Sequence, residues 1–271
     1  MTVANAVLKL TDVSKSYGAN KAIEAVSLTV QAGEFVALLG PSGAGKSTIF
    51  RCVSQLTRPD VGDVFLNAKR LNDLHGQALR LERRRIGLIF QQFNLVSRLN
   101  ALQNVLLGRL GHMPGWRATL GLFSQADRQL ALRALDRVGL LHKAYQRADT
   151  LSGGQQQRVA IARVLTQKSD LILADEPVAS LDPTTSRQVL SNLRAVALEN
   201  KMAILCSLHQ VDLALEFADR VVAVSNGQIS LNKSADQVSV RELEGIYADK
   251  PDPVVLEPLS PIVLESKASF A

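Results

Sequence analysis

The side chains best suited to chemistry in this sequence are those of a glycine-rich loop and of a strand far downstream that ends in two acids. The loop is GPSGAGKST, from Gly40 to Thr48, and the strand is LILADE, which ends in Asp175 and Glu176. A loop of this kind wraps backbone N–H groups around phosphate oxygens, and its Lys46 neutralises their charge. The two motifs together indicate a site that binds and hydrolyses a nucleoside triphosphate.

The context of the loop supports this interpretation, because a strand is predicted before it over residues 34–39 and a helix after it over residues 48–55. Gly43 and Gly45 let the backbone turn its N–H groups inward, and the positive end of the helix attracts phosphate. Ser47 offers a hydroxyl to Mg²⁺. The predicted nucleotide-binding residues of this phosphate loop are Gly40, Pro41, Ser42, Gly43, Ala44, Gly45, Lys46, Ser47 and Thr48.

The two acids have different predicted roles. Asp175, at the end of its strand, is expected to hold Mg²⁺ directly or through water. Glu176 is placed to polarise or deprotonate the attacking water as a general base. A strand that ends in acids is common as a solvated strand end, but downstream of a phosphate loop the pattern indicates a metal and catalytic role.

A third motif, LSGGQ at residues 151–155, discriminates between nucleotide-binding classes. Ser152, followed three residues later by Gln155, is a capping box that predicts a helix running to about residue 167. Gly153 and Gly154 leave the start of that helix bare enough for a γ-phosphate to approach. A simple helix cap is the alternative, but the position about twenty residues ahead of the acids favours a nucleotide contact.

The elements that must position these motifs alternate along the chain. Besides the strand before the phosphate loop, strands are predicted at residues 7–13, 25–30, 64–66 (after a turn at 60–63), 86–90, 171–174, 203–208, 221–224 and 228–231. Between residues 91 and 151 helical spacing replaces the strand pattern, most clearly at 125–138. The order predicts an α/β fold with a parallel sheet, crossover helices and an inserted helical lobe.

Composition and charge agree with this class. Of 271 residues, 46% are hydrophobic and only 4% aromatic, so the core is predicted to be aliphatic. The net charge of +6 comes from scattered basic residues, so no nucleic-acid partner is predicted. The strongest basic cluster, at 83–85, is expected to be solvated.

Cys52 and Cys206 are predicted to be buried, reduced thiols. Neither a signal peptide nor a transmembrane segment is predicted, which favours the cytoplasm.

From about residue 7 to residue 229, with seven motifs in order, the sequence resembles the ATP-binding subunits of ABC transporters. The resemblance implies a phosphate-loop NTPase fold of the ABC ATPase type. It comprises a RecA-like core, an antiparallel β subdomain and a helical subdomain inserted at about residues 92–165. The ABC ATPase domain would span residues 1–249, and residues 250–271 form a proline-containing tail of unassigned role. The implied cofactors are ATP and Mg²⁺.

The resemblance also implies roles for residues outside the first motifs. Tyr17 would stack on adenine, Gln91 would sense Mg²⁺ and water, Asp182 would contact the other subunit, and His209 would meet the γ-phosphate. The alternatives are a strand-end aromatic for Tyr17, a structural histidine for His209, and the neighbouring Gln92 as the sensor. Residues 152–155 would cover ATP held by a second copy of the chain, so hydrolysis would require a head-to-tail dimer.

Residues 89–111, 114–117 and 207–224 resemble the phosphonate importer branch of that family. The branch implies two membrane permease subunits, a periplasmic or lipid-anchored phosphonate-binding protein, and a peripheral position on the cytoplasmic face of the inner membrane. Phosphite and hypophosphite are alternative cargoes. A soluble ABC ATPase acting on nucleic acid or ribosomes is disfavoured, because neither a second cassette nor a long coiled-coil insertion is present.

The single tryptophan allows two interpretations at the sequence level. Trp116 either fills the core of the helical lobe or forms, with Met113 and Leu120, an apolar patch that receives a permease helix.

Overall fold

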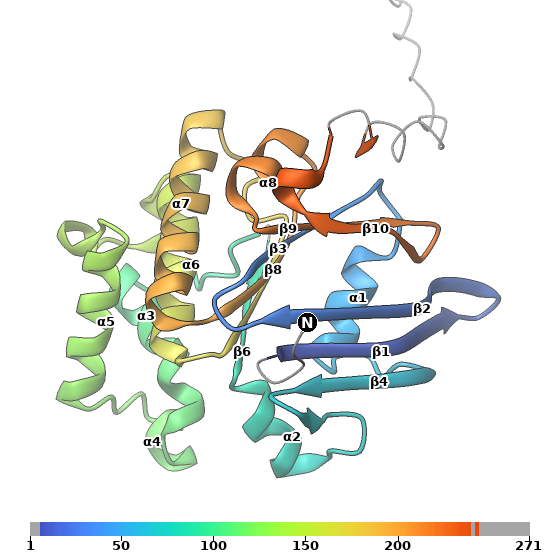
Figure 1. Cartoon of the computed structure of the whole chain (residues 1–271). Coiled ribbons are helices and arrows are strands. Elements are labelled where there is room, and N and C mark those ends of the chain that lie inside the picture. The colour runs from blue at the N-terminus through green and yellow to red at the C-terminus, as the bar shows by residue number, and fades with distance from the viewer. Residues whose placement is uncertain (1–5, 91, 240–241, 244–271) are drawn as a thin grey trace, which may run out of the picture.

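The computed structural model describes residues 6–90, 92–239 and 242–243. Figure 1 shows the arrangement of their helices and strands. The strands are β1 (Ala6–Tyr17), β2 (Asn20–Gln31), β3 (Phe35–Leu39), β4 (Val61–Leu66), β5 (Lys69–Arg70), β6 (Ile86–Phe90), β7 (Leu171–Asp175), β8 (Ala203–Ser207), β9 (Arg220–Ser225) and β10 (Gln228–Ser234). The helices are α1 (Lys46–Val53), α2 (Gly76–Arg83), α3 (Ala101–Leu106), α4 (Gly115–Thr119), α5 (Gln125–Arg137), α6 (Gly153–Gln167), α7 (Pro183–Asn200) and α8 (Val211–Phe217), with a 3-10 turn η2 (Leu107–His112) after α3.

The larger sheet carries the candidate site. Within the described residues its strand order is β10-β9-β3-β8-β7-β6, and all strands but the edge strand β10 run parallel to their neighbours. Strands β3 and β8 are buried along their whole length, as expected for parallel strands covered on both faces. Because parallel strands end at one edge, the loops after β3, β7 and β8 are brought together there. The predicted α/β fold is confirmed.

Alternate residues of β3 face two separate apolar cores. Phe35 and Leu39 pack with the helical lobe and α7, whereas Val36 and Leu38 pack with α1 and the smaller sheet. Figure 1 shows the same layers, with α6 and α7 on one side of the larger sheet and α1 and the antiparallel strands on the other. Because successive side chains of a strand point to opposite faces of the sheet, β3 contributes residues to both cores.

The smaller sheet is antiparallel, in the order β2-β1-β4-β5. Its first two strands are longer than predicted, because β1 and β2 pair along most of their length as one hairpin. The predicted turn at residues 60–63 is wrong, since β4 already begins at Val61 and pairs there with Ser14. Gly62 lies within the strand at φ 84°, where a Cβ would approach the Asp12 carbonyl oxygen to 2.3 Å. The glycine marks a close backbone approach beside a register shift, not a turn.

The helical segment between β6 and β7 contains α3, α4, α5 and α6. Leu102, Leu135 and Ile161, one from each of α3, α5 and α6, are buried in its core. Trp116 does not belong to that core, because its side chain is 64% exposed on the short helix α4. Leu120 directly after this helix is 66% exposed. The core-filling interpretation of Trp116 is therefore wrong.

The arginine cluster at residues 83–85 is also more structural than predicted. Arg83 is half-buried and its Nε donates to the Ser54 carbonyl oxygen at 3.1 Å, while half-buried Arg84 donates to the Gly111 carbonyl oxygen. These two guanidinium groups donate hydrogen bonds to carbonyl oxygens where loops meet, so the expectation of a solvated cluster is wrong for them.

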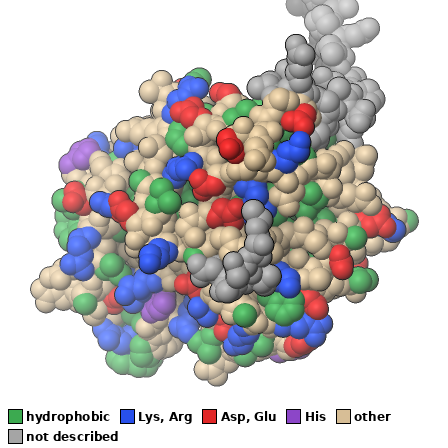
Figure 2. Space-filling model, in the orientation of Figure 1, with side chains coloured by type: hydrophobic (Ala, Val, Ile, Leu, Met, Phe, Trp, Pro, Cys, Tyr) green, Lys and Arg blue, Asp and Glu red, His purple; other side chains and the backbone are tan. Residues whose placement is uncertain are grey.

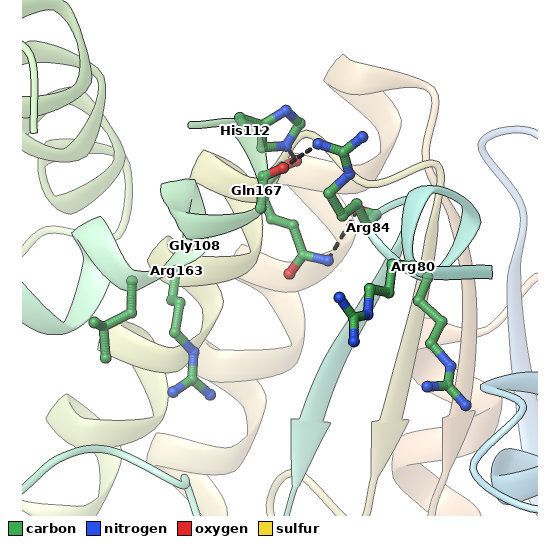
Figure 3. A pocket seen from close by; sticks show the side chains of 9 residues that line it. Arg80, Arg84, Gly108, His112, Arg163 and Gln167 are labelled. Carbon is green, nitrogen blue, oxygen red and sulfur yellow. Dashed lines mark hydrogen bonds between the residues drawn. The ribbon is translucent and has the colours of Figure 1, made fainter. Parts of the chain in front are cut away.

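Arg84 lies at a hollow between α2, η2 and α6 that Arg163 also lines (Figure 3). In Figure 3 these two side chains point in different directions and not toward a common centre.

Charges on the visible face are mixed. Figure 2 shows Lys and Arg side chains interspersed with Asp and Glu over that face, without a basic stripe.

Both cysteines are free and buried, as predicted. Burial raises the pKa of the Cys52 thiol to about 11 and also raises the pKa of Cys206. No helix in the described part of the chain is long and apolar enough to cross a membrane.

Candidate nucleotide-binding site

The phosphate loop joins the end of β3 to the start of α1. Gly40, Gly43 and Gly45 have φ of 145°, 76° and 109°, a region that favours glycine. A Cβ on Gly45 would lie 2.6 Å from the Ala22 carbonyl oxygen, so the close approach of β2 also excludes a side chain there. Gly45 is the N-cap of α1 and brings no side chain to compete for the first N–H groups of the helix, which suits an anion.

Lys46 is the first residue of α1 and is only 6% exposed. Its Nζ donates to the carbonyl oxygens of Gly40 at 2.6 Å and Pro41 at 3.1 Å, which holds the ammonium group inside the loop. Burial lowers the pKa of Lys46, and the negative charges of Glu176 and Asp175 oppose that shift. A phosphate group in the loop would stabilise the charged form in the same way.

A cavity of about 380 Å³ opens beside the loop. It is lined by Tyr17, Asn20, Lys21, Ala22, residues 42–48 of the loop, and Glu176. Tyr17 is the last residue of β1 and is 44% exposed, with the Lys15 Nζ 5.7 Å from the centre of its ring. The structure thus places the predicted aromatic contact beside the predicted phosphate contacts. A planar base on the Tyr17 ring with its phosphates in the loop is a chemically reasonable occupant.

Two of the three predicted metal residues lie at or next to this cavity. Asp175 ends β7, and it lines a neighbouring cavity of about 320 Å³ together with Ser47. A hydroxyl oxygen and a carboxylate oxygen at one cavity fit Mg²⁺, which prefers hard oxygen ligands and keeps places for phosphate and water. Gln91, the third predicted metal residue, lies outside the described residues.

The two predicted catalytic side chains contact each other. The Nε2 atom of His209 lies 2.5 Å from Oε1 of Glu176, although the residues are 33 positions apart. The side chain of His209 is 39% exposed and that of Glu176 24% exposed, so both are open to a ligand. Glu176 has φ 48°, a left-handed conformation that is uncommon for a residue other than glycine. Glu176 directly follows β7, and in this backbone conformation its carboxylate lies against the His209 ring.

The LSGGQ motif begins α6 as predicted. Ser152 is the N-cap: its side chain accepts from the Gln155 N–H, and the Gln155 side chain accepts from the Ser152 N–H. The helix then runs to Gln167. Ser152 is exposed, and among the described residues that line the phosphate-loop cavity none belongs to 152–155. These residues are therefore not brought to the nucleotide cavity of their own chain.

Asp182 has a local role that the sequence reasoning missed. It is the N-cap of α7, its carboxylate accepts from the Thr185 N–H at 3.0 Å, and Pro183 follows it in the first turn. The hydrogen bonds from Thr185 lower the pKa of Asp182, which keeps the carboxylate charged. The pattern Asp-Pro-Thr-Thr could have signalled this cap.

The sequence also gave no prediction for Arg163, whose contacts lie beside the candidate site. It lies on α6, and its guanidinium group donates to the carbonyl oxygens of Phe93 and Asn94 at 3.2 and 2.6 Å. Phe93 and Asn94 have φ of 49° and 47°, so the segment directly after Gln91 takes an uncommon path that Arg163 holds against the helix of the LSGGQ motif. A lone arginine within the apolar run VAIARVL was the only sequence signal.

Comparison with known proteins identifies the family. Residues 23–179 match the family model for ABC transporters. The chain belongs to the ABC transporter family. It is 48% identical over 240 residues to the hypophosphite import ATP-binding protein HtxD of Stutzerimonas stutzeri, covering 89% of this chain and 70% of that protein.

A second curated relative and a solved structure support the same family. The phosphonates import ATP-binding protein PhnC of Lactobacillus johnsonii is 47% identical over 242 residues, with 89% of this chain and 95% of that protein covered. Among solved structures, the dimeric ATP-binding cassette MJ0796 in a post-hydrolysis state bound to ADP and Pi has a TM-score of 0.74 and 34% identity, over 84% of this chain and 98% of that one. This ABC transporter subunit therefore has the ABC ATPase fold, and ATP is its nucleotide.

In this ABC ATPase, Gly154 sets the contact between α6 and α7. A Cβ on Gly154 would lie 2.3 Å from Cγ2 of Thr185. Gly154→Ala is expected to push the two helices apart, to lower the stability by about 1–3 kcal/mol, and to reduce ATP turnover. Thermal melting and phosphate release measure both effects.

The double variant Gly154→Ala with Thr185→Ser removes the clashing methyl group and keeps the hydroxyl, so it should recover most of the lost stability. Gly115→Ala serves as the control, because no atom lies within 4 Å of the Cβ position there. A double variant as unstable as Gly154→Ala would contradict the packing explanation.

Proposed function

We propose that this chain is the ATP-hydrolysing subunit of an ABC importer for phosphonates, and that it works as a head-to-tail dimer. The observation that carries the proposal is the division of the site. The phosphate loop, Tyr17 and Glu176 line one cavity, whereas Ser152 is exposed and takes no part in lining it. A second copy would supply residues 152–155 to close over the nucleotide, so ATP would contact both copies only in the closed dimer.

Each residue of the site has a proposed role. Residues 40–48 and Tyr17 bind the nucleotide, and Ser47, Asp175 and Gln91 hold Mg²⁺. The metal, when bound, would neutralise charge on the transferred phosphoryl group. Glu176 takes the proton of the attacking water, and His209, in contact with Glu176, faces the γ-phosphate. Ser152, Gly153, Gly154, Gln155 and Asp182 act on the partner copy's nucleotide.

The cargo assignment rests on the relatives and not on the site, because an ATPase need not touch the transported anion. Several relatives are named as phosphonates import proteins and one as a hypophosphite import protein, at closely similar identity. A phosphonate is the proposed cargo, with hypophosphite or phosphite as the alternative. The proposed domain limits are residues 1–249 for the ABC ATPase domain and about 92–165 for the helical subdomain.

The proposed partners are two membrane permease subunits and a periplasmic or lipid-anchored phosphonate-binding protein, which would place this chain on the cytoplasmic face of the inner membrane. The exposed Trp116 and Leu120 support a permease contact on the helical subdomain, since large apolar side chains open to solvent are typical of interaction sites. Residues 250–271 lie outside the described residues and receive no role.

Uptake of labelled methylphosphonate tests the whole proposal. Cells that depend on this chain should take up the label, and cells carrying Glu176→Gln in its place should not. Excess phosphite and, separately, excess hypophosphite serve as competitors. Uptake that resists both competitors supports phosphonate as the cargo, whereas strong competition by either anion points to that anion. Equal uptake with the wild-type chain and the variant would contradict the proposal.

A further inference from the structure

Ser207 links the two acidic residues that follow one another at the end of β7. It is the last residue of β8, it is fully buried, and it pairs in the parallel register with Asp175. Its Oγ donates to Oδ1 of Asp175 at 2.8 Å and accepts from the backbone N–H of Glu176 at 2.9 Å. One hydroxyl therefore contacts a carboxylate and the next peptide group at once.

The chemistry of a serine hydroxyl makes the direction of both bonds definite. It has a single proton to donate and lone pairs to accept with, so the proton is committed to Asp175 and a lone pair to the Glu176 N–H. The hydrogen bond also fixes the orientation of the Asp175 carboxylate that accepts this proton. An apolar residue at position 207 would leave the partly buried N–H of Glu176 and a carboxylate oxygen of Asp175 without these partners.

The hydrogen bond to Glu176 coincides with an uncommon backbone conformation. Glu176 has φ 48°, a conformation that costs free energy and persists only where the surroundings hold it. The Ser207 hydroxyl holds its N–H, and the carboxylate of Glu176 then reaches the His209 ring at 2.5 Å. Ser207 thus contacts the backbone at the point from which the Glu176 side chain leaves the end of β7.

We propose that Ser207 is a positioning residue for ATP hydrolysis, which orients Asp175 toward Mg²⁺ and Glu176 toward the attacking water through one shared hydroxyl. With Oδ1 of Asp175 held by Ser207, Oδ2 would be free to hold the metal, directly or through water. The inference rests on the proposed roles of Asp175 and Glu176. It assigns to the end of β8 a role in hydrolysis separate from that of His209, two residues further on.

The first test is Ser207→Ala in the full chain. Turnover is expected to fall about tenfold, in line with the loss of a hydrogen bond to a charged group, while the KM for ATP changes less than about twofold. The Mg²⁺ concentration for half-maximal turnover should rise several-fold, because Asp175 loses its orientation. Binding of a fluorescent ATP analogue without Mg²⁺ should stay unchanged. A purely structural role would lower the melting temperature without moving the Mg²⁺ curve.

Two comparisons sharpen the test. Ser207→Thr keeps the hydroxyl and is expected to restore turnover and the Mg²⁺ curve. Ser169→Ala is the matched control, because Ser169 is a buried serine just before β7, near the opposite end of that strand. Among the described residues, the hydrogen bond of its hydroxyl is to the Met202 sulfur, at 4.0 Å. It should leave turnover, KM and the Mg²⁺ curve unchanged.

A double-mutant cycle with Glu176→Gln decides whether Ser207 acts through Glu176. Single-turnover measurements with radiolabelled ATP give the slow rate of Glu176→Gln, and Ser207→Ala should lower that rate by clearly less than tenfold if the two residues act together. A full further tenfold loss, or normal turnover and Mg²⁺ dependence in Ser207→Ala alone, would overturn the inference. Full turnover in Glu176→Gln would instead contradict the proposed role of Glu176, so the two failures are distinguishable.

Discussion

Glu176→Gln is expected to lower ATP turnover about a thousandfold while ATP still binds, because an amide cannot accept the proton of the attacking water. The substitution keeps the size of the side chain and an oxygen that His209 can contact. With hydrolysis blocked, ATP should remain between two copies and favour a stable dimer. Phosphate release measures the turnover, and light scattering after size-exclusion chromatography with and without ATP measures the dimer.

Glu216→Gln is the matched control for this variant. Glu216 is an acid on α8 that pairs with Arg187 at 2.9 Å on the surface, so its loss should change neither turnover nor dimerisation. A Glu176→Gln chain that stays monomeric with ATP and hydrolyses it at the normal rate would refute both the general base and the dimer.

Ser152→Phe is expected to reduce hydrolysis at least about a hundredfold, because a bulky ring at the start of α6 prevents the partner's γ-phosphate from approaching the helix N-terminus. ATP binding to the same chain should persist, since Ser152 does not line the phosphate-loop cavity of its own chain. Equilibrium binding of a fluorescent ATP analogue and phosphate release measure the two effects separately.

The loss of the Ser152 cap alone must be separated from this effect. Ser124 caps α5 with the same type of capping box, so Ser124→Ala removes a comparable cap at a cost of about 1 kcal/mol and should leave turnover intact. Mixing Ser152→Phe chains with Lys46→Ala chains should restore part of the activity that both lack alone, because each mixed dimer contains one intact composite site. Normal turnover in Ser152→Phe would contradict the composite site.

The sequence by itself determined those features whose hydrogen bonds close within a few residues. The capping box of Ser152 and Gln155 predicted the start of α6, and its end at Gln167 agreed. The glycines of the phosphate loop likewise predicted a backbone that wraps around phosphate, and Gly43 and Gly45 have positive φ in the structure. Such features depend on local backbone geometry, which neighbouring side chains decide, so they can be read from the order of residues alone.

The tertiary structure alone decided which distant residues meet. Ser207 reaches Asp175 and Glu176 only because β8 pairs in register with β7, and nothing local to SLHQ indicates that partner. In the same way, Arg163 holds the segment after Gln91 only because α6 packs beside it. These contacts span tens of residues and depend on strand order, register and helix packing, which sequence periodicity does not specify. The motifs therefore predicted which residues would carry the chemistry, and the parallel sheet decided how the two carboxylates are held.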